Sequence, residues 1–144
     1  MPKFHEIPFI QKHIELYRRD PEKAHMWNSG EAGVVPTLLL TTTGRKSGEP
    51  RALPLIYGES DGRYVVIASR GGTPTHPVWY LNLEANPECE LQLGAKHVRA
   101  RARVAGGAER ERLWKQMAAI YPPYDDYQQR AGARTIPVVV LEPR

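Results

Sequence analysis

Residues 37–58, TLLLTTTGRKSGEPRALPLIYG, decide the fold class of this chain. Two runs of β-favouring residues, 37–43 and 51–58, flank a short segment that contains two glycines. Such runs, separated by a glycine-containing turn, predict two neighbouring strands. A third run, RYVVIAS at 63–69, follows the hairpin-type turn ESDG at 59–62. The middle of the chain is therefore expected to build a β-sheet.

The flanking regions predict helices and three more strands. Residues 5–19 place apolar side chains at spacings of three and four, which predicts an amphipathic helix. Residues 75–86 predict a second helix with Thr75 as its cap, and residues 107–121 predict a third. The remaining strands are expected in CELQL (89–93), KHVRARARV (96–104) and TIPVVVLEP (135–143). We interpret the arginine row of 96–104 as the solvated face of that strand.

Six strands joined by tight turns and longer helical returns predict a closed antiparallel barrel with helices at its rim, because closure removes exposed sheet edges. The 144 residues suffice for one core, expected at 29–144 after an N-terminal helix and linker at 1–28. That helix either packs on the barrel or lies on a membrane. Its mixed polar face favours packing.

Composition argues against several classes of protein. The chain has 41% hydrophobic and 25% charged residues, which is typical of a globular domain. A net charge of +4 falls short of the dense basic clustering expected for nucleic-acid binding. No apolar run approaches the roughly 20 residues that span a bilayer, so we expect a cytoplasmic chain. The single cysteine, Cys89, and five scattered histidines predict neither a disulfide nor a metal site.

The turn at 44–51 concentrates positive charge. Arg45, Lys46 and Arg51 lie within seven residues, beside Gly44 and Gly48. Glycines let backbone N–H groups approach a ligand, and phosphate or carboxylate groups would suit this charge. Hairpin tips are also basic and glycine-rich because they face water, and for the turn alone this second interpretation is the stronger one.

A second loop changes that balance. In ASRGGTPTHPVW, residues 68–79, a strand ends and a helix begins around a Ser-Arg-Gly-Gly turn. Backbone donors, a helix N-terminus and a cationic side chain then converge, which favours an anion site over an ordinary connecting loop. Two turns with glycine and arginine within thirty residues strengthen the prediction.

Three tyrosines, Tyr121, Tyr124 and Tyr127, recur with a period of three. This spacing places the phenols on one side of a helix or turn. They either line a pocket for a flat aromatic ligand or cover the edge of the core, and the spacing alone does not separate these interpretations.

Several motifs in one order resemble the deazaflavin-dependent nitroreductase family, which comprises coenzyme F420-dependent oxidoreductases built on a split β-barrel. The motifs are TTTGRKSGEPRALPL (41–55), VVIASRGGTPTHPVWYLNLEANPE (65–88), YPPYDDYQ (121–128) and IPVVVLEP (136–143). The resemblance covers about residues 30–144. It implies a mainly β (α+β) split barrel of about six mostly antiparallel strands, and an actinobacterial source such as a mycobacterium.

The resemblance also implies a set of cofactor contacts. F420 is a 5-deazaflavin that carries a phosphate and an oligoglutamate tail. The phosphate and tail are expected at Arg45, Lys46, Ser47 and Arg51, and contacts along the cofactor at Pro54 and Leu55. The loop around the phosphate and deazaflavin is expected at Ala68, Ser69, Arg70, Gly71 and Gly72, with a wall completed by His76, Pro77, Trp79 and Asn82.

The implied catalytic positions are Ser69, beside the reacting end of the ring, and the substrate-pocket tyrosines Tyr121, Tyr124 and Tyr127. Tyr124 or Tyr127 is the expected hydrogen-bond donor to the substrate. The implied reaction is hydride transfer from C5 of reduced F420 to an electron-poor acceptor, namely a quinone, an activated alkene or a nitroaromatic compound.

Three alternatives stay open at this point. The barrel could bind FMN instead, or the protein could carry F420 or a quinone without turnover. The N-terminal helix could also hold the chain at the inner face of the cell membrane. The sequence does not choose between a monomer and a homodimer.

Overall fold

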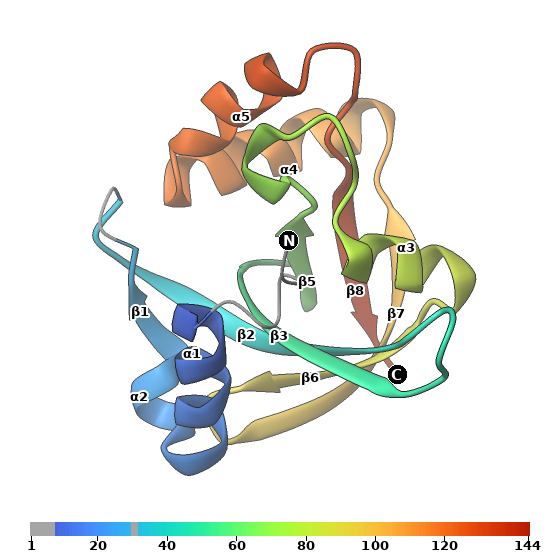
Figure 1. Ribbon diagram of the computed structural model, residues 1–144. Helices are drawn as coiled ribbons and strands as arrows, with labels where there is room; N and C mark the ends of the chain where they lie inside the picture. The colour runs from blue at the N-terminus through green and yellow to red at the C-terminus, as the bar shows by residue number, and fades with distance from the viewer. Residues whose placement is uncertain (1–7, 30–31) are drawn as a thin grey trace.

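The computed structural model of the protein describes residues 8–29 and 32–144 (Figure 1). The helices are α1 (Pro8–Arg19), α2 (Pro21–His25), α3 (Val78–Ala85), α4 (Gly107–Ile120) and α5 (Pro123–Ala131), and η2 (Arg70–Gly72) is a single 3-10 turn. The strands are β1 (Met26–Asn28), β2 (Val34–Thr43), β3 (Pro50–Ile56), β4 (Gly58–Ser60), β5 (Arg63–Ile67), β6 (Glu88–Leu93), β7 (Lys96–Val104) and β8 (Val138–Pro143).

These strands form one curled antiparallel sheet in the order β1-β2-β6-β7-β8-β5-β4, and β3 pairs with β2. The expected hairpin is present, with Thr37 opposite Ile56 and Thr43 opposite Pro50. Within the described ranges β3 pairs only with β2, while β5 pairs with β4 and β8. Strand β4 follows β3 after Tyr57 alone and pairs with β5, so these strands link β2 to β5 around the barrel, while no ladder of the described residues joins β3 itself to β5. The antiparallel barrel is confirmed, and we call the unpaired stretch between β3 and β5 the split.

The barrel interior and one outer face are both apolar. Successive strand residues point to opposite faces, so Val66, Val139 and Leu141 enter the interior while neighbours such as Val65 and Val140 face outward. Helices α4 and α5 cover that outer face, as Figure 1 shows at the top of the molecule. Because both faces of β5 and β8 are covered, their sequences are continuously apolar instead of alternating.

Helix α1 packs on the barrel with its apolar stripe. Ile10, Ile14 and Tyr17 are buried against Leu39 of β2 and Ala24 of α2. Burial of a side chain of this size contributes about 1.5–3 kcal/mol. The packing interpretation is thus observed for residues 8–19, whereas residues 5–7 of the predicted helix lie outside the described residues. No helix in the described part combines the length and apolar character required to cross a bilayer.

Three short elements were not predicted, namely α2, β1 and β4. Each has only three to five residues, too few to show a helical or alternating pattern. Strand β1 adds to the sheet by pairing Trp27 with Val35. The expected linker at 20–28 is therefore structured and extends the sheet.

One local prediction was wrong. Thr75 does not cap α3, which begins at Val78 after Pro77 and has no side-chain cap. Thr75 instead accepts a hydrogen bond from the Arg70 guanidinium at 2.5 Å. The arginine row of β7 is exposed at Arg99 and Arg101, as expected, and its last member, Arg103, is half-exposed and held in ion pairs.

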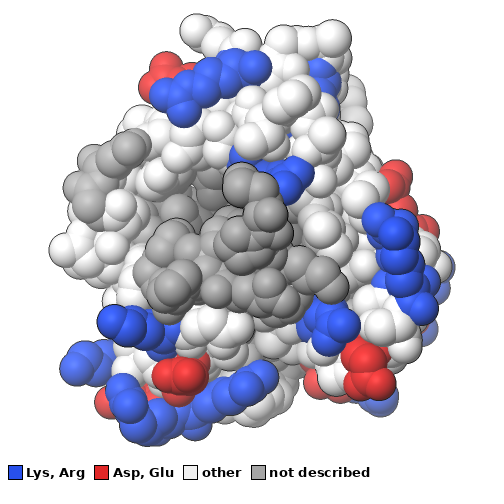
Figure 2. All heavy atoms as spheres, viewed as in Figure 1, with Lys and Arg blue, Asp and Glu red and all other residues white. Residues whose placement is uncertain are grey.

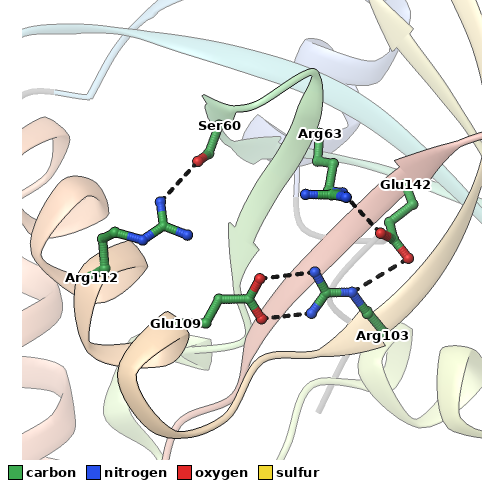
Figure 3. Close-up of polar contacts among 6 residues, drawn as sticks. All are labelled: Ser60, Arg63, Arg103, Glu109, Arg112 and Glu142. Carbon is green, nitrogen blue, oxygen red and sulfur yellow. Dashed lines mark hydrogen bonds and ion pairs between the residues drawn. The ribbon is translucent and has the colours of Figure 1, made fainter.

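Arg103 joins α4 to the sheet (Figure 3). Its guanidinium donates to both carboxylate oxygens of Glu109 on α4, at 2.6 and 2.9 Å, and pairs with Glu142 of β8 at 3.3 Å. Glu142 also binds Arg63 of β5 at 2.9 Å. Four charges on four elements form one network, which fixes the start of α4 against β5, β7 and β8.

This network predicts a pH-dependent effect of Glu109→Gln. The hydrogen bonds and charge of Arg103 lower the pKa of Glu109 from its ordinary value of 4.5. A carboxyl whose folded-state pKa lies below its unfolded-state pKa stabilises the fold above the unfolded value, and this stabilisation is lost as pH falls through the folded-state pKa. We expect the variant to melt at a lower temperature than the wild type at neutral pH.

The difference in melting temperature is expected to shrink as pH falls below the ordinary carboxyl value of 4.5, because the wild-type carboxyl loses its charge as pH approaches its lowered pKa. Circular-dichroism melts at neutral and at acidic pH measure it. Glu111→Gln, at an exposed residue of the same helix, is the matched control. An equal loss at both pH values would contradict the assignment.

Candidate functional site

The predicted cofactor contacts lie on both edges of the split. Pro54 and Leu55 belong to β3, and Ala68 directly follows β5. Pro54 and Ala68 are buried, and Leu55 is half-buried against the interior. Proline lacks an N–H and is suited to an edge strand, as β3 is. The fold thus brings Pro54 and Leu55 of β3 and Ala68 at the end of β5 to the two sides of the split.

The β2–β3 turn holds the first group of predicted contacts. It is closed by hydrogen bonds from Gly44 N–H to the Glu49 carbonyl and from Gly48 N–H to the Gly44 carbonyl, both 2.8 Å. The Ser47 hydroxyl accepts the N–H of Glu49 at 3.1 Å and a guanidinium N–H of Arg51 at 3.4 Å. Ser47 therefore shapes the turn and orients Arg51.

Two further cations project from this turn. Arg45 and Lys46 are exposed, and neither forms an ion pair with any residue in the described ranges. Because the turn itself is closed by its own hydrogen bonds, these side chains remain available to an anion. Their exposure fits both an anion site and a solvated hairpin tip. The choice between these depends on which residues lie beside the turn.

Asn82 connects this turn to α3. Its side chain is buried, accepts the N–H of Arg45 at 3.1 Å, and donates to the Thr42 hydroxyl at 3.1 Å. The amide is thus occupied by protein partners, so the structure supports an indirect role in which Asn82 positions the turn. Pro77 is the N-cap of the same helix. The β2–β3 turn is thus bonded to α3, the helix that follows the Ser69–Gly72 loop in the chain.

The Ser69–Gly72 loop has an unusual backbone. Ser69 is in the right-handed helical region (φ −78°, ψ −41°), whereas Arg70, Gly71 and Gly72 have φ of 45°, 64° and 79°. The left-handed conformation costs a non-glycine residue roughly 1–2 kcal/mol, and such strain clusters at functional sites. A right-handed residue followed by a left-handed one turns successive N–H groups to one side, which forms an anion-binding nest.

The same loop touches the tyrosine helix. A Cβ added at Gly72 would lie 2.5 Å from the Tyr127 carbonyl oxygen and 2.8 Å from its Cα. Gly72 is therefore the residue that lets the loop and α5 meet backbone to backbone. The segments predicted for cofactor and substrate are in direct contact.

Arg134 belongs to the loop although sequence reasoning missed it. It follows α5 and donates hydrogen bonds to the carbonyls of Ala68, Ser69 and Thr73. Burial lowers the pKa of Arg134, and the charge of Arg70 lowers it further. Among the described residues no carboxylate pairs with either arginine. Two guanidinium groups thus share one loop without a counter-charge, and an anion there would relieve their repulsion.

The tyrosines form one cluster. Ring centroids lie 4.9 Å apart for Tyr121 and Tyr124 and 6.2 Å apart for Tyr124 and Tyr127, and the hydroxyls of Tyr121 and Tyr127 are 3.1 Å apart. Tyr124 is buried in the core beneath α4 and α5, which raises its pKa, so its phenol stays protonated. Tyr121 and Tyr127 are half-buried. Tyr124 thus covers the core, whereas the half-buried Tyr121 and Tyr127 remain the candidates for a ligand pocket.

The predicted wall residues differ in what they offer. His76 is half-buried, and its ring lies 4.8 Å from that of Tyr80. Pro77 is buried and is the N-cap of α3, where its carbonyl accepts the N–H of Tyr80 at 3.1 Å. Trp79 is only 6% exposed and belongs to the barrel core. His76 is thus the wall residue whose polar side chain is accessible.

A separate cavity of about 540 Å³ opens where β2 and β6 diverge. Its lining includes Thr41, Thr43, Glu88, Glu90, Arg99 and Arg144. Glu88 is paired with Arg144 at 2.5 Å, so the lining has no excess of positive charge. It contains none of the predicted cofactor contacts, and we place the site at the split instead.

Cys89 is a buried, free cysteine. Burial raises the pKa of its thiol to about 12, so the sulfur stays protonated. Across residues 8–29 and 32–144, no group of three His, Cys, Asp or Glu side chains is arranged to hold a metal ion. Figure 2 shows Lys and Arg side chains spread around the viewed face among Asp and Glu, without one continuous basic surface.

Comparisons with known proteins show the family of this chain. The sequence pattern of the F420H(2)-dependent quinone reductase family matches residues 11–143. An F420H(2)-dependent quinone reductase of Mycobacterium tuberculosis is 41% identical over 115 residues, which cover 78% of this chain and 76% of that protein. The family match includes most of α1, so the likeness begins earlier than the motifs from residue 30 onward suggested.

Solved structures show the same relationship. A structure described as an F420-H2 dependent reductase (FDR-A) has a TM-score of 0.69 and 46% identity, over 74% of this chain and 94% of that one. A second, described as a domain-swapped dimer, has a TM-score of 0.70 and 40% identity, over 94% of this chain and 100% of that one. These likenesses confirm the split barrel. With its sequence matched from residue 11 to residue 143, the chain belongs to the F420H(2)-dependent quinone reductase family.

Proposed function

We propose that the chain binds reduced F420 along the split between β3 and β5 and reduces quinones held beside the tyrosine cluster. The observation that carries this proposal is the pair of cationic turns at α3. One presents Arg45 and Lys46, and the other combines a backbone nest with two guanidinium groups that lack a counter-charge. A cofactor with both a phosphate and a carboxylate tail matches two separate anion sites.

The described residues fit this cofactor. The Ser69–Gly72 nest suits a phosphate, because backbone N–H groups and Arg70 act on it together. The exposed cations of the β2–β3 turn suit the flexible carboxylates of a glutamate tail. Leu55 and Ala68, on the two edges of the split, offer apolar contacts to a planar ring.

In this proposal the residues of the chain bind and orient the cofactor and the quinone. Reduced F420, when bound, supplies the hydride from its C5 position. The loop at Ser69 orients the ring, and α5 excludes water from one side. The hydroxyl pair of Tyr121 and Tyr127 donates a hydrogen bond to the quinone oxygen that becomes negative, which is where a preorganised donor lowers the barrier.

Substitution of the tail contacts tests the binding mode. In Arg45→Ala/Lys46→Ala we expect the dissociation constant for F420 to rise about tenfold at low salt, because two exposed charge contacts are lost. The increase should shrink as salt screens the remaining attraction. Quenching of F420 fluorescence measures the constant. Arg18→Ala/Arg19→Ala removes the same charge from the end of α1 and should leave it unchanged; equal effects of both pairs would mean that only net charge matters.

FMN is the competing cofactor. It has a phosphate but no glutamate tail, so the β2–β3 turn would have no partner in an FMN protein. Parallel titrations with F420 and FMN separate the two, and tighter binding of FMN would overturn the proposal. A protein that binds reduced F420 but oxidises it with no quinone, enone or nitro acceptor would instead be a carrier.

Assembly and location extend the proposal further. The relative described as a domain-swapped dimer suggests that this chain also dimerises, which light scattering after size exclusion measures. A peripheral membrane contact through α1 has less support, because its apolar side chains are buried on the barrel. Co-sedimentation with anionic vesicles would support the contact, and a chain that stays in the supernatant would reject it.

A further inference from the structure

Arg134 binds one loop at four places. Its Nε donates to the Thr73 carbonyl at 2.8 Å, its Nη1 to the Ala68 carbonyl at 3.1 Å, and its Nη2 to the Ser69 carbonyl at 2.7 Å. Nη1 also lies 3.1 Å from Nδ1 of His76. One half-buried side chain thus holds both ends of the segment 68–76, which contains the strained turn.

These bonds determine where the loop's N–H groups point. The peptide bonds of the described residues are all trans, so each C=O and the N–H of the next residue point in opposite directions. Since the carbonyls of Ala68 and Ser69 face Arg134, the N–H groups of Ser69 and Arg70 face away from it. No backbone or side-chain acceptor in the described ranges binds these two N–H groups.

The same contact sets the tautomer of His76. A guanidinium has donors and no acceptor, so Nδ1 of His76 must accept and its proton must lie on Nε2. The neutral ring then presents an N–H donor at its other nitrogen. Arg134 therefore orients three hydrogen-bond donors, namely two backbone N–H groups and one imidazole N–H. It does so without contacting the ligand itself.

We propose that Arg134 is the positioning residue of the anion site: it clamps the carbonyl side of the 68–76 loop onto the end of α5, so that the donors of the loop face the cofactor. The inference rests on the proposed function for the identity of that ligand. It assigns a role to a residue that no motif marks, and it couples the cofactor loop to the helix carrying Tyr127.

Lysine cannot replace this arginine. A single ammonium group can reach one or two of the acceptors, whereas the planar fork of arginine meets three carbonyls and a ring nitrogen together. In Arg134→Ala and Arg134→Lys we expect the F420 dissociation constant to rise about tenfold or more, which corresponds to about 1.4 kcal/mol. Turnover at saturating reduced F420 should fall less than affinity, because the tyrosines stay in place.

Chemical rescue distinguishes positioning from a general loss of stability. Millimolar guanidinium should restore F420 affinity to Arg134→Ala and should not improve the wild type. Arg103→Ala is the control, since it also removes a multiply bonded arginine from the sheet surface; its F420 affinity should stay unchanged. Wild-type affinity in Arg134→Ala, or full recovery of affinity by lysine, would overturn the inference.

Hydrogen exchange of the cofactor-free protein tests the clamp without F420. The N–H groups of Gly72 and Thr73 donate within the loop to Ser69 and Arg70, and in Arg134→Ala both should exchange faster than in the wild type. Unchanged exchange would overturn the clamp. If exchange accelerates while the wild type binds no F420, the clamp stands and the proposed cofactor is wrong.

Discussion

Replacement of Gly72 by alanine is expected to lower the free energy of unfolding by about 2–5 kcal/mol and to abolish most F420 binding. Two costs add at this position. The left-handed backbone costs an alanine roughly 1–2 kcal/mol, and overpacking against Tyr127 adds about 1–3 kcal/mol. The clash is with backbone atoms at 2.5 and 2.8 Å, which cannot move aside without shifting α5.

Gly71→Ala is the matched control. Gly71 also has a positive φ, 64°, but an added Cβ would meet no atom within 4 Å. It should therefore carry the backbone cost alone, roughly 1–2 kcal/mol. Urea unfolding gives both free energies, and an F420 titration gives both affinities. Equal losses in the two variants would show that contact between the loop and α5 is unimportant.

Tyr127→Phe is expected to lower kcat for quinone reduction about 100-fold, within the usual range for a positioned proton donor, while F420 affinity changes little. The variant keeps the ring and removes the hydroxyl that lies 3.1 Å from that of Tyr121. Steady-state rates with reduced F420 and a quinone measure the effect.

Substitutions of further tyrosines show whether a loss of kcat in Tyr127→Phe is specific. Tyr64→Phe, in the barrel interior, serves as a control for loss of a hydroxyl and should retain activity. Tyr124→Phe tests the other predicted donor. Unchanged kcat in Tyr121→Phe, Tyr124→Phe and Tyr127→Phe would show that no phenol of the cluster assists the reaction. A large loss of F420 affinity would move the tyrosine cluster to the cofactor side.

The sequence predicted the elements whose signals are local. Strands β2, β3 and β5 follow from runs of β-favouring residues, and α1 from its apolar spacing. The split was not predictable from these patterns, because whether β3 meets β5 depends on the curl of the whole sheet. Three-residue strands such as β1 carry no pattern and appear only once a neighbouring strand pairs with them.

The site shows the same division. Its cations and glycines were visible as turn chemistry. The family motifs indicated F420 and quinone reduction, which family membership now confirms. The individual contacts remain proposals. Arg134 left no trace in the sequence, since a single basic residue after Gly132 resembles any helix end. Its partners lie about sixty residues away, so only the folded chain reveals it.

Anaerobic mixing of the protein with reduced F420 and menadione tests whether the protein passes a hydride from F420 to a quinone. We expect oxidised F420, followed by its fluorescence, to appear in proportion to the menadione consumed. The rate should depend on the protein concentration and fall sharply in Tyr127→Phe. Reduced F420 that stays unoxidised in the presence of the wild-type protein and a series of quinones would contradict it.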